Sequence, residues 1–241
     1  MSLKMKSPPS IARPATSNLL LAALSPDDLA LITPQLEPVM LNLRDVLYEP
    51  GADITHAYFP TTGCVSMIHG TSDGSVEVGT IGLEGLVGVP ILLRASSEPT
   101  RALVQVEGEA YRIPAEAFRS VVAESEHLER IMLRYALALF NQVAQSVACN
   151  RLHSLEERCA RWLLITHDRV DGDVFKLTQE FLSYMLGVHR PAVTLAAGVL
   201  QAAGYIKYSR GTITVTDREG LEGASCSCYQ QTQDDYALLA S

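Results

Sequence analysis

The 241-residue sequence contains no long apolar run. Its first apolar burst, Leu19 to Leu24, is six residues long, whereas a membrane-spanning helix needs roughly 18 to 20. The chain also has no basic head followed by a long apolar stretch and a small-residue cleavage site, so no export signal is indicated. We therefore expect a cytoplasmic protein that does not bind a membrane. An apolar fraction of 47% excludes a disordered chain.

Cysteine is scarce. The chain has five, an odd number, which favours free thiols in a reducing compartment over a disulfide framework. Cys226 and Cys228 are separated by one residue and have no second cysteine pair to complete a four-ligand metal site. We interpret them as inert thiols and predict no metal site.

Positive charge is also in short supply. The chain has 19 basic and 27 acidic residues and a net charge of −8, which taken alone argues against a nucleic-acid partner. The charges are unevenly placed, however. Between Lys176 and Arg210 there are four basic residues and one acid, a local net of +3, whereas the rest of the chain carries 15 basic and 26 acidic residues. An acidic protein with one basic region can meet DNA through that region.

Glycine is concentrated in one part of the chain. Nine of the sixteen glycines fall between Gly51 and Gly108, where they separate short segments rich in valine, isoleucine, threonine and aromatic residues. Asp73 and Gly74 form a dipeptide favoured in two-residue hairpin turns. The pattern from about residue 39 to 113 predicts a small antiparallel barrel or roll.

Glycine and proline then disappear for the 57 residues between Pro114 and Gly172, which predicts helix. Apolar residues recur there at helical spacing: Leu128, Ile131, Tyr135, Leu139, Val143, Val147 and Leu152, widened by Met132, Leu133, Ala136 and Phe140. A face this wide can pack one side on the β-rich region and offer the other to a second copy of the chain. Ser154 and Glu157 form a capping-box pattern, so a new helix is expected after residue 153.

The segment from 177 to 216 predicts a winged helix-turn-helix. Thr178 is placed to cap a helix that ends at Gly187, and Pro191 opens a second helix that ends at Gly204. Two short strands follow, 205–208 and 212–216, and form the wing.

In that geometry the start of the second helix enters the major groove. Arg190 is the best candidate for a bidentate contact with guanine, and the amides at Thr178 and Gln179 suit a phosphate. The predicted DNA-contacting residues are Thr178, Gln179, His189, Arg190, Thr194, Lys207 and Arg210.

With these elements in order, residues 18 to 225 resemble the cyclic-AMP receptor protein and fumarate-nitrate regulator (Crp/Fnr) family of bacterial transcription factors. The residues that carry the resemblance are Tyr48 to Gly51, Gly63, Glu84 to Leu86, Arg158 to Leu163, and Leu177 to Gly187 with Arg190 and Val193.

The resemblance implies an α+β fold with an N-terminal antiparallel β-roll, a long dimerisation helix and a C-terminal winged helix-turn-helix. The expected divisions are a disordered arm (1–17), the roll (18–125), the helix (126–153), the DNA-binding domain (154–225) and a tail (226–241). It also implies a homodimer that binds a two-fold DNA operator, acts on RNA polymerase, and responds to a small-molecule effector in the roll. The junction at 150–154 is expected to transmit that signal.

The departures from the family pattern concern the effector. Nucleotide-binding members use a Gly-Glu-Leu loop, an Arg-Ser pair and a Thr-Ser pair; the aligned positions here are Gly85 and Leu86, Thr100 and Arg101, and Val143 and Ala144. The ribose-binding carboxylate and the base-binding hydroxyls are missing, which argues against cyclic AMP. An anionic ligand held by Arg101 stays open, and the predicted effector residues are Glu84, Gly85, Thr100 and Arg101. Pro191 and Leu195 replace a glutamate and an arginine of the recognition helix, so a different operator is expected.

The sequence also bears on a cofactor, a cysteine-based sensor and an enzyme. Family members that bind an iron-sulfur cluster carry closely spaced cysteines near the N-terminus, and here no cysteine precedes Cys64. We predict no cofactor. The main alternative is a redox- or metal-responsive regulator that acts through cysteines. For a thiol sensor the candidates are Cys64, Cys149 and Cys159. A cupin-type enzyme would need clustered metal ligands, and His56 and His69 are thirteen residues apart without a close partner, so we predict no enzyme.

Overall fold

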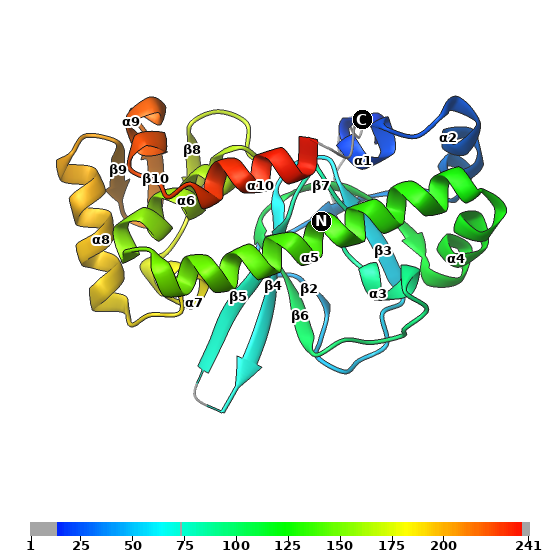
Figure 1. Cartoon of the computed structure of the whole chain (residues 1–241), viewed down its shortest axis with the longest axis horizontal. Helices are drawn as coiled ribbons and strands as arrows, with labels where there is room; N and C mark the ends of the chain where they lie inside the picture. Colours follow the sequence, from blue (N-terminus) through cyan, green and yellow to red (C-terminus); the bar gives the residue numbers. More distant parts are fainter. Residues whose placement is uncertain (1–13, 73, 238–241) are drawn as a thin grey trace, which may run out of the picture.

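The computed structural model describes residues 14–72 and 74–237 (Figure 1). It contains an N-terminal β-roll and a C-terminal helical region, and the long helix α5 (Glu126–Leu152) runs along both. The α+β architecture predicted from the sequence is confirmed. Within the described ranges, no helix is both long enough and apolar enough to span a bilayer.

Short helices precede the roll: η1 (Ala15–Ser17), α1 (Leu19–Ala22), α2 (Pro26–Ile32) and η2 (Thr33–Gln35). Ser25 caps α2 by accepting a hydrogen bond from the Asp28 amide. Asn18 is fully buried, and its side-chain amide donates to the carbonyls of Pro60 and Gly85 at 2.8 Å each. The arm predicted for residues 1–17 is therefore too long, because its last three residues form η1; residues 1–13 lie outside the described part.

The roll consists of two antiparallel sheets with strand orders β1-β7-β3 and β2-β6-β4-β5. The strands are β1 (Glu37–Leu41), β2 (Val46–Tyr48), β3 (His56–Pro60), β4 (Cys64–Thr71), β5 (Gly74–Ile81), β6 (Thr100–Val106) and β7 (Gly108–Pro114). The predicted hairpin joins β4 to β5, with Thr71 opposite Gly74. Asp73, the other residue of the predicted turn, lies outside the described residues.

Two helices and α5 cover the roll. The two helices are α3 (Val89–Leu92) and α4 (Ala115–Glu124). The next residue after α4, Ser125, is the N-cap of α5. Tyr135 of α5 is fully buried and lies against Gly85, where an added Cβ would overlap the ring and the hydroxyl of the tyrosine. Glycine at 85 is thus required by the close approach of α5 to the roll.

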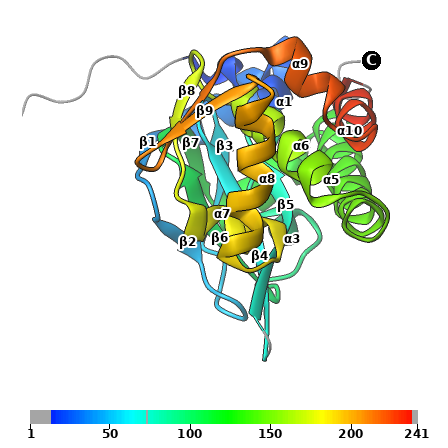
Figure 2. The same cartoon turned by 90° about the vertical axis from the view of Figure 1, so that its left-hand side faces the viewer.

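The C-terminal region has its own apolar core. Its elements are α6 (Leu155–His167), β8 (Val174–Lys176), α7 (Gln179–Leu186), α8 (Arg190–Ala202), β9 (Ile206–Ser209), β10 (Thr212–Val215) and α9 (Arg218–Gly223). Ser154 and Glu157 form the predicted capping box of α6. The third strand of the small sheet, β8, pairs with β10 and was not predicted. Figure 2 shows this end of the molecule, with α8 facing the viewer.

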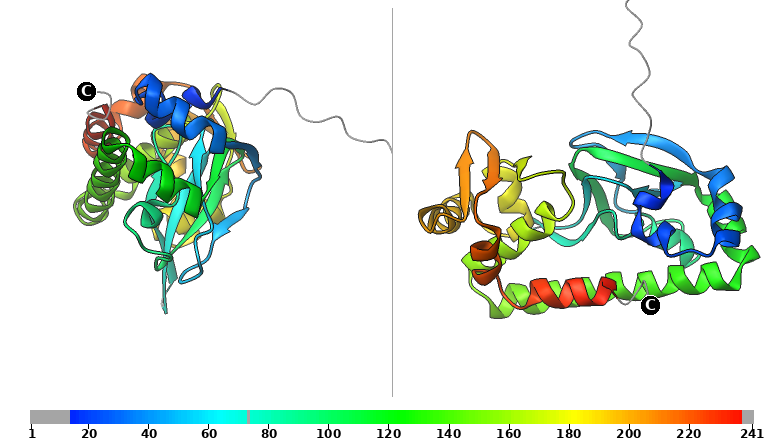
Figure 3. Two further views of the ribbon diagram at one scale, coloured as in Figure 1. Left: turned by 90° about the vertical axis from the view of Figure 1, so that its right-hand side faces the viewer. Right: turned by 90° about the horizontal axis from the view of Figure 1, so that it is seen from above.

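The last element is α10 (Cys228–Ala237), which lies along α5 in both Figure 1 and the right-hand view of Figure 3. The two helices are antiparallel, because Cys228 contacts Gln145 whereas Tyr236 contacts Gln142. The Tyr236 ring also stacks on Tyr135, with centroids 6.4 Å apart. The segment 226–241, expected to be a tail, is therefore corrected to a packed helix over residues 228–237; residues 238–241 lie outside the described part.

Buried polar contacts join the roll to α6. Arg169, just after α6, pairs with Glu84 at 2.6 Å, and both side chains are nearly inaccessible, at 6% and 11% exposure. Gln105 of β6 donates to Thr166 at 3.1 Å. The two regions are therefore held together by specific polar pairs as well as by apolar packing.

Candidate nucleic-acid interface and effector site

The helix-turn-helix is built by local sequence signals. Thr178 caps α7, its hydroxyl accepting a hydrogen bond from the Phe181 amide at 3.1 Å. Gly187 ends α7 with a φ of +62°, a left-handed conformation that favours glycine. Val193 and Leu200 of α8 are buried, which fixes the outward face of this helix.

Four of the seven predicted DNA-contacting residues converge on one hollow. Thr178, Gln179, Arg190 and Arg210 line a hollow of about 410 Å³, with Tyr208 and Gly211 completing it. The hydroxyl of Thr194 is 3.2 Å from the Gln179 side-chain oxygen, which places Thr194 beside this group. Residues from two helices and the wing thus meet, although up to 32 residues separate them in the sequence.

Two of the predicted residues lie apart from the hollow. His189 is the N-cap residue of α8 and is exposed, and its side chain makes no capping hydrogen bond. Lys207 is exposed on β9 and does not line the hollow. Both side chains are free to reach an extended polyanion beside the hollow.

The wing turn positions Arg210. Arg210 and Gly211 have φ values of +50° and +75°, so both central residues of the turn are left-handed, as in the tightest hairpin connections. This conformation is uncommon for arginine and fixes where its side chain leaves the backbone. The Arg210 side chain consequently borders the same hollow as Arg190.

Tyr208 and Val199 were not predicted as site residues, and Leu195 was noted only as a departure from the family pattern. Burial raises the pKa of Tyr208 to about 12, so the phenol keeps its proton and donates to the Leu177 carbonyl at 2.9 Å. Leu195 and Val199 are exposed on the outward face of α8, at 71% and 53%. The sequence signal for these two residues was their four-residue spacing, which places them on one face of α8 away from the buried face of Val193 and Leu200. Such side chains can contact thymine methyl groups.

The predicted effector residues are not brought together. Glu84 pairs with Arg169, and Gly85 lies beneath Tyr135. Arg101 is about half exposed and pairs with Glu49 at 2.7 Å. Glu84, Gly85 and Arg101 thus have different neighbours in this structure, and their binding of an effector stays a prediction.

A cavity does lie between the roll and α5, close to Thr100. It has about 200 Å³ and mostly apolar walls, contributed by residues including Met67, Ile81 and Leu139. Its polar residues are Tyr48 and Glu98, which are hydrogen-bonded to each other, and the buried Thr100 hydroxyl lies beside Tyr48. Burial and the neighbouring Glu98 raise the pKa of Tyr48, so it remains a neutral donor. A carboxylate in this cavity disfavours an anionic ligand.

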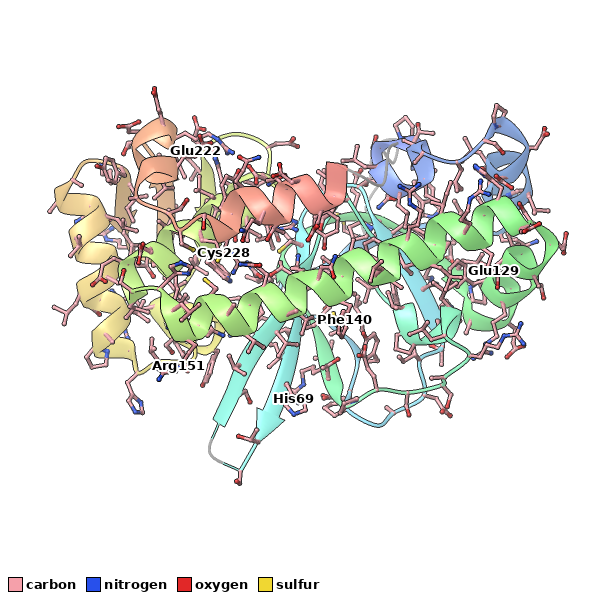
Figure 4. All side chains as sticks on the ribbon, in the orientation of Figure 1. His69, Glu129, Phe140, Arg151, Glu222 and Cys228 are labelled. Carbon is pink, nitrogen blue, oxygen red and sulfur yellow. The ribbon has the colours of Figure 1, made fainter. Side chains whose placement is uncertain are left out.

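The five cysteines fall into two groups. Cys64 and Cys159 are fully buried; burial raises the pKa of Cys64 well above its ordinary value and that of Cys159 to about 12. These two thiols are unreactive. The other three, Cys149, Cys226 and Cys228, meet at the start of α10. Figure 4 labels Cys228 there.

Two family models match the chain. Residues 157–224 match a model described as a Crp-like helix-turn-helix domain, and residues 39–125 match one described as a cyclic nucleotide-binding domain. A comparison with curated protein sequences gave no match.

Solved structures share the fold at low sequence identity. FixK2 from Bradyrhizobium japonicum has a TM-score of 0.67 and 15% identity, covering 79% of this chain and 98% of that one. A CRP-family transcriptional regulator from Thermus thermophilus has a TM-score of 0.65 and 18% identity, covering 78% and 96%. The c-di-GMP-responsive global regulator CLP of Xanthomonas campestris has a TM-score of 0.61 and 16% identity, covering 79% and 99%.

Proposed function

Since the chain belongs to the Crp/Fnr family of DNA-binding transcriptional regulators, we propose that it acts as a homodimer that reads a two-fold operator through α8 and the wing. The observation that carries this proposal is the convergence of Thr178, Gln179, Arg190 and Arg210 around one hollow. Arg190 reads a base edge, Thr178 and Gln179 hold a phosphate at the start of α7, and Lys207 and Arg210 add attraction to the backbone.

The dimer contact is a heptad stripe on α5. One set of exposed positions alternates by three and four residues, the spacing of a two-stranded coiled coil: Arg130, Leu133, Leu137, Phe140, Ala144, Val147 and Arg151. Phe140 and Val147 are 67% and 68% exposed in the single chain. Figure 4 labels Phe140 on the edge of α5 that faces away from α10 in this view. Pairing two stripes covers these apolar side chains.

Signal transfer has a structural route in this proposal. The turn of the helix-turn-helix rests on the roll, because a Cβ at Gly187 would lie 3.2 Å from Val76 of β5. Ser66 of β4 lies 3.5 Å from the Met185 sulfur of α7. Movement of β4 and β5 on ligand binding would therefore press directly on α7 and reorient α8.

The effector in this proposal is a small, mostly apolar molecule bound beside Tyr48 and Glu98. The carboxylate of Glu98 disfavours cyclic nucleotides, in agreement with the missing ribose and base ligands. The regulator acts in the cytoplasm and alters transcription by touching RNA polymerase or by blocking it, and it performs no catalysis.

The test is selection of bound sequences from random DNA with the purified protein, followed by binding measured across a salt series. The expected result is an inverted-repeat sequence whose half-sites are one helical turn apart, bound with strongly salt-dependent affinity. Binding of one half-site by a monomer, or affinity that ignores salt, would overturn the proposal.

A further inference from the structure

Four metal-ligating side chains meet at the junction of α5, α6 and α10. They are Cys149 and His153 at the end of α5, Cys226 just before α10, and Cys228 at its start. Their ligand atoms all lie within 4.8 Å of one another, and the three cysteines are buried. We call these four residues the thiol–imidazole cluster. The sequence reading found no partner pair for Cys226 and Cys228 because Cys149 is 77 residues away from Cys226.

The spacing of the cluster matches a tetrahedral metal site. With Zn–S near 2.3 Å and Zn–N near 2.0 to 2.1 Å, a tetrahedron has sulfur–sulfur edges of about 3.8 Å and sulfur–nitrogen edges of about 3.6 Å. The Cys149 and Cys226 sulfurs are 3.5 Å apart, and the Cys228 sulfur is 3.5 Å from His153 Nδ1. Iron-sulfur clusters divide their four ligands among two or four iron atoms and need a wider arrangement than a single ion does.

We propose that the thiol–imidazole cluster binds one Zn²⁺ per chain. Three thiolates and one imidazole are a standard donor set for structural zinc, which takes four protein ligands and leaves no position for water. Binding displaces the three thiol protons into solvent.

The surroundings suit a site with excess negative charge. Three thiolates around Zn²⁺ carry a net charge of −1. The Gln145 side-chain amide donates to the Cys228 sulfur at 2.9 Å, the kind of outer contact that orients a metal ligand. Arg158 interacts electrostatically with Cys149 and Cys226, and Arg161 with Cys149. The side-chain Nε atoms of both arginines are buried without a hydrogen-bond partner among the described residues, whereas Arg158 Nη2 donates to the Leu186 carbonyl.

The position of the site suggests control of the DNA-binding region. His153 is the C-cap of α5 and Ser154 is the N-cap of α6, so the metal would be held at the joint between these helices. Cys226 and Cys228 follow the wing and α9, so the same ion would tie the far end of the DNA-binding region to α5. This step rests on the proposed function: zinc would fix the joint and thereby the orientation of α8.

The first experiment measures metal on the full-length protein. Purified wild-type protein should retain or take up one Zn²⁺ per chain by elemental analysis, and Co²⁺ exchanged into it should give the strong visible bands of a tetrahedral thiolate site. Cys226→Ser and His153→Ala should each lower the zinc content at least tenfold, and Gln145→Ala should weaken affinity about tenfold. Circular dichroism establishes whether each variant is folded. If a cysteine variant does not fold, His153→Ala, which changes a partly exposed residue, still tests the site.

The matched control is Cys159→Ala, which removes a buried cysteine outside the cluster and should keep one Zn²⁺ per chain. Zinc content that is the same in all variants, or a Cys149–Cys226 disulfide in protein purified under reducing conditions, would overturn the assignment.

The second experiment separates this proposal from the proposed function. Removing zinc with a chelator should weaken operator binding at least tenfold, and adding Zn²⁺ back should restore it in wild type but not in Cys226→Ser. Zinc binding without any DNA binding would leave the metal site standing and overturn the regulator proposal. Equal DNA binding with and without zinc would overturn the claim that zinc sets the orientation of α8.

Discussion

Trp162 of α6 donates its indole N–H to a carboxylate oxygen of Glu77 of β5 across 2.9 Å. Thr80 donates to the same oxygen at 3.0 Å, whereas the second carboxylate oxygen has no partner in the described part of the chain. Burial, which outweighs these hydrogen bonds, raises the pKa of Glu77 above its ordinary value of 4.5. This buried carboxyl joins the roll to the DNA-binding region.

The first prediction concerns pH. The pKa of Glu77 is raised in the folded state, so this carboxyl stabilises the fold most at low pH, where it is protonated in both the folded and the unfolded chain. The free energy of unfolding falls as the pH rises from 4.5 through the raised pKa of the folded state. Glu77→Gln keeps an acceptor for Trp162 and has no charge. Its free energy of unfolding should therefore equal that of the wild type near pH 4.5 and exceed it at pH 8, as measured by urea denaturation at both pH values.

Glu77→Ala leaves the Trp162 indole unpaired and should lower the free energy of unfolding by about 1–3 kcal/mol at either pH. Parallel pH profiles of wild type and Glu77→Gln would contradict the prediction.

The second prediction assigns different roles to two basic residues. Arg190→Ala should lose about 1–3 kcal/mol at one base pair and relax selectivity there, because a bidentate base contact is removed. Lys207→Ala should weaken binding to all sequences and reduce the salt slope by about 1, because a phosphate contact is lost. Fluorescence anisotropy with the selected operator and single-base variants measures both. The assignment fails if Lys207→Ala alters selectivity and Arg190→Ala does not.

The third prediction concerns the heptad stripe. Phe140→Glu places a charge in the centre of the α5 pairing surface and should convert the dimer to a monomer, as measured by light scattering coupled to size exclusion. Met40→Glu is the control, because Met40 is exposed to a similar degree, 55% against 67%, on β1. A dimer that persists in Phe140→Glu would show that the stripe is not the interface.

The fourth prediction treats Glu84 as a structural residue. Removing its side chain leaves Arg169 charged and buried, so Glu84→Ala should destabilise the fold by about 3–5 kcal/mol. Arg101→Ala breaks an exposed pair and should change stability by less than about 1 kcal/mol. Urea denaturation compares them. Similar small effects for both would refute the structural role of Glu84.

Local signals were sufficient to predict much of this molecule. Thr178, Gly187 and the Ser154–Glu157 box act on their own neighbours, so the helices they cap were found from the sequence. The long helix was found because 57 residues without glycine or proline leave few alternatives.

What the sequence did not predict depends on distant contacts. α10 was missed because its polar sequence, CYQQTQDDYA, has no clear apolar face; it packs through single contacts such as Tyr236 with Gln142. The ion pair of Glu84 was not predicted because its partner, Arg169, is 85 residues away in the sequence. No local pattern identifies such a partner.

The return of α10 along α5 has a mechanical consequence. A domain attached at one point can swing in every direction, whereas a domain attached at two points is left mainly with rotation about the line that joins them. The DNA-binding region is joined to α5 at residue 154 and again through α10, whose Tyr236 reaches Gln142. The line between these attachments runs along α5, so once the contacts with the roll loosen, the motion left to the region is a rotation about that helix. In the proposed dimer, α8 would then move on an arc around the coiled-coil axis, and its angle in the DNA groove would change together with its distance from its counterpart.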